Sequence, residues 1–338
     1  MLEIKHNYSL KLHNTFGIDV KTDLFADVSK PEQIVEIVSS DIFKEKSHLI
    51  LGGGSNILFT KDFNGIILHS SVSSVELLGE DEISVLIKAG SGENWDEFVG
   101  YCLNNNWGGL ENLTKIPGNV GAAPVQNIGA YGAEVKNLIE TVEGVNLSDG
   151  KKYIFSVNEC EFGYRTSIFK QKLKNDFFIT YVTFRLSKPP HKLIFDYGSV
   201  ELELKKYQDI NIKTLGEVIN KIRYEKLPDV NITGNAGSFF KNPIVTNKTA
   251  DILKKEYVDI PVYPIDKNTA KLSAAWLIDK CGCKGIKKGN VGTHEKQPLV
   301  LINLGNATGK EVIELAHYIK KRVSDKFKIT LEPEVNIV

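Results

Sequence analysis

The sequence of 338 residues lacks an excess of charge of either sign. Lys and Arg total 42, and Asp and Glu also total 42, so the formal net charge is zero. Nucleic acids and anionic membranes attract proteins with a positive field, so neither is an expected partner. Residues 1–7 lack the apolar region of a secretory signal, and no apolar run reaches the length of a membrane span. We therefore expect a soluble cytoplasmic protein.

Residues that form disulfides or bind metals are also scarce. The cysteines lack the paired spacing of a zinc site, and the Cys-Gly-Cys pair is too short for an ordinary disulfide loop. No histidines stand four residues apart, and His294 beside Glu295 is best explained as a surface histidine. We expect no metal and four free thiols, Cys102, Cys160, Cys281 and Cys283.

Three motifs of nucleotide-binding and hydrolytic enzymes are missing. No glycine loop is followed by Lys-Ser or Lys-Thr at Walker spacing, and none has the Gly-x-Gly-x-x-Gly fingerprint that opens a helix. No Gly-x-Ser-x-Gly nucleophile elbow is present either. These absences disfavour phosphoryl transfer, a Rossmann dehydrogenase and an α/β-hydrolase.

What the chain does have is a long stretch with little side chain. Residues 116–132 contain four glycines, three alanines, two prolines and no charged residue. Such a backbone cannot continue a helix, and it can lie close to a ligand. A second loop, Gly52–Asn56, follows a predicted strand at 48–51, and its amides can cradle phosphate. One such loop alone would be explained as a Gly-rich turn, but the two together favour a bound cofactor.

Hydrophobic periodicity predicts an α+β protein with no internal repeat. Predicted helices begin near Pro31, after an Asn94 cap, at a Thr214–Glu217 capping box, at 272 and after a Thr308–Glu311 capping box. In the second of these helices, Trp95 and Cys102 fall on the core face. The predicted strands are 48–51, 65–69, 82–89, 138–147, 151–155, 177–186, 298–304 and 329–338.

Six motifs, taken in order, resemble those of the UDP-N-acetylenolpyruvoylglucosamine reductases, flavin enzymes of peptidoglycan precursor synthesis. The resemblance extends from about residue 15 to the carboxyl terminus. The segment 176–190 with Phe195-Asp-Tyr-Gly198 is similar to the longer form of the family, which has an extra tyrosine loop over the substrate. The motifs are 52–56, 109–113, 116–132, Tyr-Arg-Thr-Ser at 164–167, Gly-Asn-Ala-Gly-Ser-Phe-Phe-Lys-Asn-Pro at 234–243, and Glu-Pro-Glu-Val at 332–335.

The resemblance implies a three-domain α+β flavoprotein with an FAD-binding region of the vanillyl-alcohol-oxidase (PCMH) type. The implied domains are FAD-binding subdomain 1 (1–70, joined by 327–338), FAD-binding subdomain 2 (71–210) and a substrate-binding domain (211–326). FAD would be non-covalent, because neither loop has a histidine or cysteine to attach it. The implied FAD contacts are Gly52, Gly53, Gly54, Ser55, Asn56, Pro117, Gly118, Gly121, Ala122, Gln126, Asn127, Gly129, Ala130, Tyr131 and Gly132.

The resemblance also implies a reaction and three catalytic residues. NADPH would reduce the flavin, which would then pass hydride to the enolpyruvyl ether of a UDP-sugar, giving UDP-N-acetylmuramate. Arg165 would hold the substrate carboxylate with its planar fork. Glu334 would polarise the same carboxylate, and Ser238 would donate a proton to carbon. Read alone, these residues would be a surface arginine, a loop-capping serine and a solvated glutamate.

Three further residues, Tyr197, Lys226 and Asn242, match family contacts to the substrate diphosphate or the nicotinamide. Arg223 lies one helical turn before Lys226, and such a basic pair suits a UDP diphosphate. Asn336 departs from the pattern, since many relatives have arginine two positions after the glutamate. We expect a monomer. Two other functions remain open at this stage, a flavin oxidase that uses oxygen and a binding module that has lost the chemistry.

Overall fold

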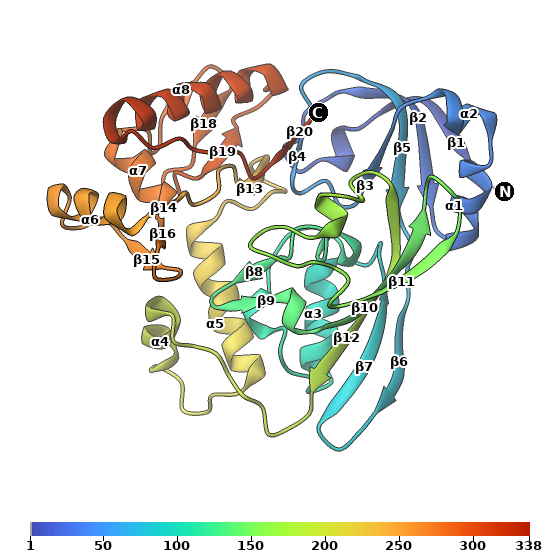
Figure 1. The fold of residues 1–338 in the computed structure, drawn as a ribbon, viewed down its shortest axis with the longest axis horizontal. Helices are drawn as coiled ribbons and strands as arrows, with labels where there is room; N and C mark the ends of the chain where they lie inside the picture. Colours follow the sequence, from blue (N-terminus) through green and yellow to red (C-terminus); the bar gives the residue numbers. More distant parts are fainter. Residues whose placement is uncertain (1) are drawn as a thin grey trace. The chain divides into compact units, whose positions relative to one another are not determined.

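The computed structural model describes residues 2–338 and divides them into two compact units. The first unit comprises residues 2–8, 22–54 and 64–225, and the second comprises 9–21, 55–63 and 226–338. Both units mix helices with sheets, which agrees with the predicted α+β class (Figure 1). The three-domain division stays a prediction. None of the helices in residues 2–338 is long and apolar enough to cross a membrane.

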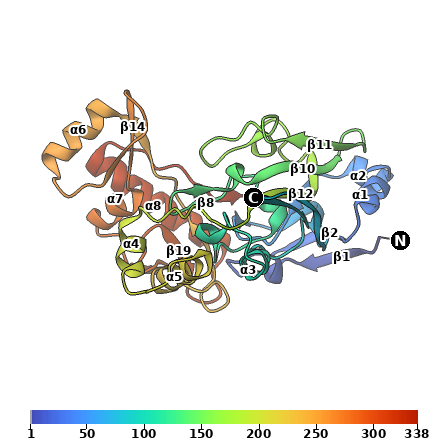
Figure 2. The same cartoon turned by 90° about the horizontal axis from the view of Figure 1, so that it is seen from below.

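The first sheet of the first unit has four strands in the order β1-β2-β5-β3. Ile34 and Ile37 of α1 and Phe43 of α2 pack on Leu24 and Ile66 of this sheet. Figure 2 shows the two helices side by side. The predicted helix at Pro31 and the predicted strands at 48–51 and 65–69 are confirmed. The elements are β1 (Ile4–Ser9), β2 (Lys21–Val28), α1 (Pro31–Val38), α2 (Asp41–Glu45), β3 (His48–Leu51) and β5 (Phe63–Ser70).

The second sheet of this unit is antiparallel and has five strands in the order β11-β10-β12-β7-β6. Four of its strands correspond to the strands predicted at 82–89, 138–147, 151–155 and 177–186. The strands are β6 (Val75–Glu80), β7 (Ser84–Gly90), β10 (Ile139–Asn146), β11 (Lys152–Ser156) and β12 (Phe177–Ser187).

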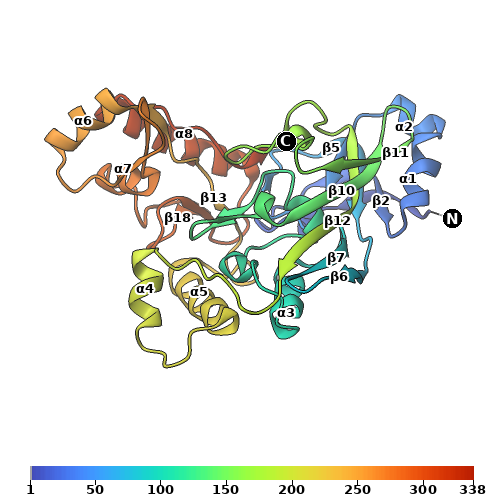
Figure 3. The same ribbon diagram turned by 60° about the horizontal axis from the view of Figure 1, so that its bottom comes forward.

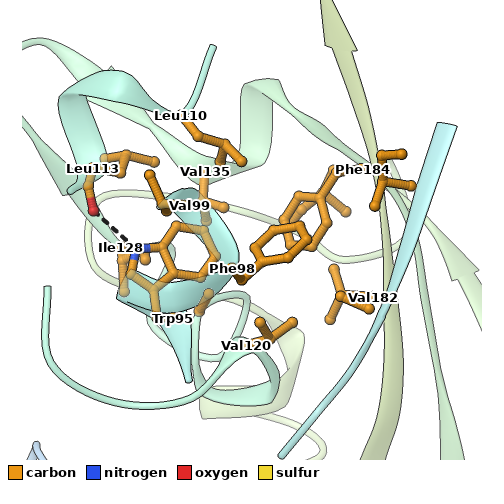
Figure 4. Packing of buried hydrophobic residues seen from close by; sticks show 14 of the residues in the cluster. Trp95, Phe98, Val99, Leu110, Leu113, Val120, Ile128, Val135, Val182 and Phe184 are labelled. Carbon is orange, nitrogen blue, oxygen red and sulfur yellow. Dashed lines mark hydrogen bonds between the residues drawn. The ribbon is translucent and has the colours of Figure 1, made fainter. Parts of the chain in front are cut away.

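Helix α3 (Trp95–Asn104) packs its apolar face against the five-stranded sheet (Figure 4). It begins at the predicted cap, where the Asn94 side chain accepts hydrogen bonds from the amides of Asp96 and Glu97. The Trp95 indole N–H donates to the Leu113 carbonyl oxygen at 2.8 Å. Trp95 and Cys102 are therefore core residues, as predicted, and burial raises the pKa of the Cys102 thiol to about 12.

Helices α4 (Gly198–Leu204) and α5 (Ile212–Lys226) lie side by side around a small apolar cluster (Figure 3). The capping box predicted at Thr214 is wrong, because α5 starts two residues earlier. The Asn211 side-chain oxygen accepts hydrogen bonds from the amides of Lys213 and Thr214. Asn211 thus accepts the free amides of the first turn, and Thr214 lies inside the helix and not at its cap.

The second unit has a four-stranded sheet ordered β13-β19-β18-β17 and a three-stranded sheet ordered β14-β16-β15. The Thr308–Glu311 capping box at the start of α8 is confirmed. The helix predicted from 272 begins at Ala274, since Leu272 ends a strand. The elements are β13 (Asn235–Ser238), β14 (Ile244–Thr246), α6 (Asn247–Glu256), β15 (Val262–Pro264), β16 (Thr269–Leu272), α7 (Ala274–Lys280), β17 (Lys287–Lys288), β18 (Val291–Thr293), β19 (Val300–Asn303) and α8 (Gly309–Phe327).

The last predicted strand, 329–338, is much shorter in the structure. Only β20 (Asn336–Ile337) forms a ladder, in parallel with β4 (Ile57–Leu58). The earlier residues include Pro333, which cannot donate to a ladder and makes an isolated bridge with Phe240. The carboxyl terminus is nevertheless fixed to the segment that follows the first glycine loop.

Candidate flavin and substrate site

The two glycine loops predicted to bind a cofactor touch each other within the first unit. A Cβ atom added to Gly53 would lie 2.6 Å from the Asn119 side-chain oxygen and 3.0 Å from the Gly118 Cα. One added to Gly52 would lie 3.7 Å from the Ala122 Cβ. Glycine at 53 is therefore required by the close approach of the two backbones. Loops 65 residues apart in sequence at Gly53 and Gly118 form one uncharged surface.

The same surface is tied to the turn that follows β7. The side-chain amide of Asn119 donates to the Gly92 carbonyl oxygen at 3.0 Å. The backbone amide of Gly121 donates to the Ser91 carbonyl oxygen at 2.9 Å. A Cβ at Gly121 would lie 2.5 Å from the Ser91 Cβ. This close packing leaves a bare backbone without charged side chains, which fits the uncharged ring system and the phosphates of a flavin dinucleotide.

The far end of the 116–132 segment forms a short hairpin of β8 (Gly129–Ala130) and β9 (Ala133–Glu134). Asn127 lies beneath it with no exposed surface. Its side-chain amide donates to Glu134 at 3.0 Å and to the Gly163 carbonyl at 2.9 Å. Burial would raise the pKa of Glu134, but hydrogen bonds from Lys136 and Asn127 outweigh it and lower that pKa. Asn127 thus braces the hairpin, and its contact with FAD stays a prediction.

Arg165 is held in one place by the backbone of this hairpin. Its guanidinium donates to the Gly129 carbonyl oxygen at 2.6 Å and to the Asn127 carbonyl oxygen at 3.3 Å. Its own backbone has φ +55°, a left-handed conformation that is uncommon for a side-chain-bearing residue. Two neutral carbonyl groups thus orient the cation, and its charge also interacts with the Glu134 carboxylate. A half-buried arginine presented in this way suits a carboxylate ligand.

Tyr131, Tyr197 and Arg223 form a polar cluster beside the hairpin. The rings of Tyr131 and Tyr197 meet edge to face with centroids 5.6 Å apart. Arg223, on α5, interacts electrostatically with Tyr131 and donates to the Lys115 carbonyl oxygen at 3.3 Å. Burial lowers the pKa of Arg223, and the charge of Asp96 opposes that shift. Two of the predicted substrate contacts, Tyr197 and Arg223, are thus brought together with Tyr131.

Ser238 ends β13 in the second unit, opposite Val300 of β19. The register shifts between Asn235 and Ser238, and Gly237 has φ +67°. The buried Asn235 side chain accepts the Gly237 amide at 2.9 Å, which fixes this irregular strand end. Within residues 2–338, the hydroxyl of Ser238 has no hydrogen-bond partner. Bulges of this kind often aim a side chain into an active site.

Glu334 lies on the chain segment next to Ser238. The Glu334 amide donates to the Phe239 carbonyl oxygen at 2.8 Å. Glu332 differs, since its side chain is 74% exposed and lies 4.0 Å from Lys241. The structure therefore separates the two glutamates that flank Pro333, and the half-buried Glu334 is the one beside Ser238.

Asn336 forms an interlocking pair with Asn56. Both its amide and its side chain donate to the Asn56 carbonyl oxygen, at 3.1 Å and 3.0 Å. The Asn56 side chain in turn donates to the Glu334 carbonyl oxygen at 3.4 Å. Asn336 thus fixes the segment of Glu334 to the end of the glycine loop, which gives this departure from the family pattern a structural role.

The other two predicted substrate contacts, Lys226 and Asn242, lie at the ends of helices. Lys226 is exposed at the end of α5. The Asn242 side-chain oxygen accepts the Ala274 amide at 2.9 Å and so serves the first turn of α7. Among residues 2–338, no three His, Cys, Asp or Glu side chains are grouped so that they could hold a metal ion.

The prediction that His294 is a surface histidine is wrong, because the residue is half-buried and one of its ring nitrogens lies buried before β19, as does the side-chain oxygen of Gln297. Within residues 2–338, the His294 Nδ1 and the Gln297 Oε1 are buried without a hydrogen-bond partner. Buried polar atoms are usually satisfied, so such atoms indicate a missing ligand or water. Nothing in the spacing of 294–297 signals this, because the burial comes from the fold of the second unit.

Family models match both parts of the chain. Residues 22–156 match the FAD binding domain, and residues 228–338 match the UDP-N-acetylenolpyruvoylglucosamine reductase, C-terminal domain. The UDP-N-acetylenolpyruvoylglucosamine reductase of Bacteroides fragilis is 46% identical over 335 residues, covering 99% of this chain and 100% of its own. The chain belongs to the UDP-N-acetylenolpyruvoylglucosamine reductase family. It is therefore an FAD-dependent oxidoreductase.

Two other comparisons agree with this assignment. The reductase of Flavobacterium johnsoniae is 42% identical over 340 residues, and the match covers 100% of both chains. The crystal structure of UDP-N-acetylenolpyruvylglucosamine reductase (MurB) from Thermus caldophilus matches with a TM-score of 0.70 at 23% identity, covering 100% of this chain and 98% of that one. This structural likeness confirms the predicted flavoprotein fold.

Proposed function

We propose that this chain reduces UDP-N-acetyl-3-O-(1-carboxyvinyl)glucosamine to UDP-N-acetylmuramate with NADPH, a step of peptidoglycan precursor synthesis. FAD, when bound, would supply the hydride-transfer chemistry between NADPH and the vinyl CH₂ carbon of the substrate. Membership of the reductase family supports the reaction, and the hydrogen bond that joins Glu334 to Phe239, next to Ser238, supports the assignment of roles. The residues proposed to hold FAD are the glycine-loop and 116–132 residues named from the sequence.

Arg165 binds the substrate carboxylate in this proposal. Hydride addition leaves negative charge on the adjacent carbon, and the charge spreads into the carboxylate. A guanidinium fixed by two carbonyl groups needs little reorganisation as that charge develops. Arg165 therefore stabilises the intermediate more than the ground state.

Ser238 donates the proton that completes the reduction, and Glu334 polarises the carboxylate. A serine hydroxyl is a weak acid, but its acceptor is a strongly basic carbanion-like carbon. Because the hydroxyl has no partner within residues 2–338, no internal hydrogen bond must break before transfer. The hydrogen bond from the Glu334 amide to the Phe239 carbonyl oxygen keeps the two residues on neighbouring segments.

The UDP portion is proposed to contact Tyr197, Arg223, Lys226 and Asn242. Arg223 and Lys226 supply positive charge for a diphosphate. The buried Oε1 of Gln297 adds an acceptor for a donor group of the ligand in the second unit.

A steady-state assay separates this proposal from the alternatives. NADPH consumption should require the UDP-sugar and should form UDP-N-acetylmuramate in equal amount. Rapid oxygen consumption with a small alcohol and no use of NADPH would instead indicate a flavin oxidase. Binding of FAD without turnover of either kind would indicate a non-catalytic module.

The proposal includes a monomer that acts in the cytoplasm, with NADPH and the UDP-sugar as its partners and neither nucleic acid nor membrane among them. The zero net charge supports the last point. Sedimentation equilibrium of the FAD-loaded chain tests the oligomeric state, and a mass twice that of one chain would contradict a monomer.

A further inference from the structure

Asn112 joins two segments that the proposed function places around the substrate. It lies in the single-turn helix Glu111–Leu113 and is 2% exposed. One side-chain nitrogen donates to the Tyr131 carbonyl oxygen and to the Ile194 carbonyl oxygen, each at 2.8 Å. Tyr131 lies near the end of the 116–132 segment, and Ile194 lies in the tyrosine loop, here defined as residues 191–197.

The base from which Asn112 acts is rigid. Leu110 and Leu113 on either side of it are fully buried, and the Trp95 indole is bonded to the Leu113 carbonyl (Figure 4). The Thr114 hydroxyl also lies 3.4 Å from the Gly216 carbonyl oxygen of α5. Because its surroundings are rigid, the Asn112 side-chain amide can fix the positions of the backbone groups to which it donates.

The tyrosine loop, by contrast, has few other attachments. At its start, the His191 ring contacts the Ser187 hydroxyl at 2.9 Å and the Asn106 side-chain oxygen at 3.2 Å. Within the described residues 2–338, the bond from Asn112 is the only hydrogen bond made by residues 192–196. Leu193 and Phe195 add apolar packing against α4 and α5.

The two segments that Asn112 joins also meet through their rings. Tyr197 packs edge to face on Tyr131, and Tyr131 in turn interacts with Arg223. Tyr131 has φ +46°, so its carbonyl direction is set by an uncommon backbone conformation that the Asn112 bond helps to hold. Loss of the shared amide would let Tyr197 and Tyr131 move independently.

We propose that Asn112 is a positioning residue that ties the tyrosine loop to the flavin-side segment, and thereby sets the affinity for the UDP-sugar without taking part in the chemistry. The carboxamide suits this task because a single group donates to both backbone carbonyls. This inference rests on the proposed function for its kinetic part, but the tether itself can be measured without turnover.

The turnover-independent test is trypsin cleavage after Lys192, which is exposed in the tyrosine loop. In the FAD-loaded chain, Asn112→Leu removes both donors at similar side-chain volume. Cleavage should become about tenfold faster, because the loop can then open without breaking the hydrogen bond from Asn112 to Ile194. Asn105→Leu is the matched control. Within residues 2–338, the Asn105 side chain bonds only to the Tyr101 carbonyl oxygen of its own helix end, so cleavage after Lys192 should not change.

The kinetic test uses the same variants. Asn112→Leu should raise the KM for the UDP-sugar about tenfold, with kcat at saturation within about twofold and FAD content unchanged. Tyr197→Ala should also raise KM, and in that background Asn112→Leu should have little further effect, since the tether acts through the loop. Asn112→Gln, which keeps the donors on a longer stem, should restore part of the affinity.

The outcomes are separable. Unchanged cleavage after Lys192 in Asn112→Leu would overturn the tether whether or not the chain is a reductase. Faster cleavage with additive KM effects in the double variant would overturn the positioning role. If Asn112→Leu does not fold, the smaller change Asn112→Ser takes its place in both assays. A parent chain without reductase activity refutes the proposed function and leaves the cleavage test in force.

Discussion

The Glu334 amide donates a 2.8 Å hydrogen bond to the Phe239 carbonyl oxygen. The Lys241 amide continues the contact with a 2.9 Å bond to the Glu332 carbonyl oxygen, and Phe240 bridges Pro333. The last segment of the chain thus lies along the strand end that carries Ser238. The backbone segments that carry Ser238 and Glu334 are therefore neighbours.

Ser238→Ala should separate the two half-reactions. Flavin reduction by NADPH should keep its rate, because the hydroxyl acts only on the enolpyruvyl substrate. Reoxidation of the reduced enzyme by the UDP-sugar should slow by about 10²–10⁴-fold, the usual effect of removing a positioned proton donor. Anaerobic stopped-flow absorbance measures both steps, and an equal loss in the two would refute the donor role.

Arg165→Lys should lower kcat/KM for the UDP-sugar by about 100-fold. A single ammonium group cannot donate to the Asn127 and Gly129 carbonyls while also pairing with a carboxylate in a fixed fork. Lysine at this position has the same unfavourable backbone φ of +55° as arginine, so backbone strain would not account for a difference in activity between the two. Arg185→Lys, on an exposed arginine bonded to Glu140, is the control, and equal activity in both variants would contradict the prediction.

Gly53→Ala should weaken FAD binding by about tenfold or more, since overpacking typically costs about 1–3 kcal/mol. Its Cβ would meet the Asn119 side chain and the Gly118 backbone, so the two loops must move apart. Gly79→Ala is the matched control, because nothing lies within 4 Å of its added Cβ. Flavin fluorescence titration gives both dissociation constants, and an unchanged value for Gly53→Ala would show that the loop contact is unimportant.

The features that the sequence predicts correctly depend on residues that are close together in the chain. The Asn94 cap and the Thr308–Glu311 box depend on residues within one turn, and both predictions are confirmed. The Thr214 box was wrong because α5 begins at Ile212, with its first amides bonded to the Asn211 side chain. The contacts of Gly53 with Asn119 and of Glu334 with Phe239 join distant segments, so no local pattern reveals them. The Ser238, Arg165 and Glu334 roles came from family motifs and stay predictions.

Glu111→Gln should alter how stability depends on pH. Burial raises the pKa of the Glu111 carboxyl above its ordinary value of 4.5, although the Gly109 amide partly opposes this shift. The folded state therefore loses stability as pH rises from 4.5 through the raised pKa, because ionising the buried group is costly. Glutamine keeps an acceptor for Gly109 and does not ionise. Urea unfolding at several pH values measures the free energy of unfolding of both proteins. The variant should become more stable relative to the parent as pH increases, whereas a difference in unfolding free energy that does not change with pH would contradict the prediction.

The most direct test of the account is an anaerobic titration of the FAD-loaded chain. Addition of NADPH should bleach the flavin absorbance near its visible maximum, and later addition of UDP-N-acetyl-3-O-(1-carboxyvinyl)glucosamine should restore it with one UDP-N-acetylmuramate formed per flavin. A chain that takes up no FAD, or a reduced flavin that the UDP-sugar does not reoxidise, would contradict the proposed reaction.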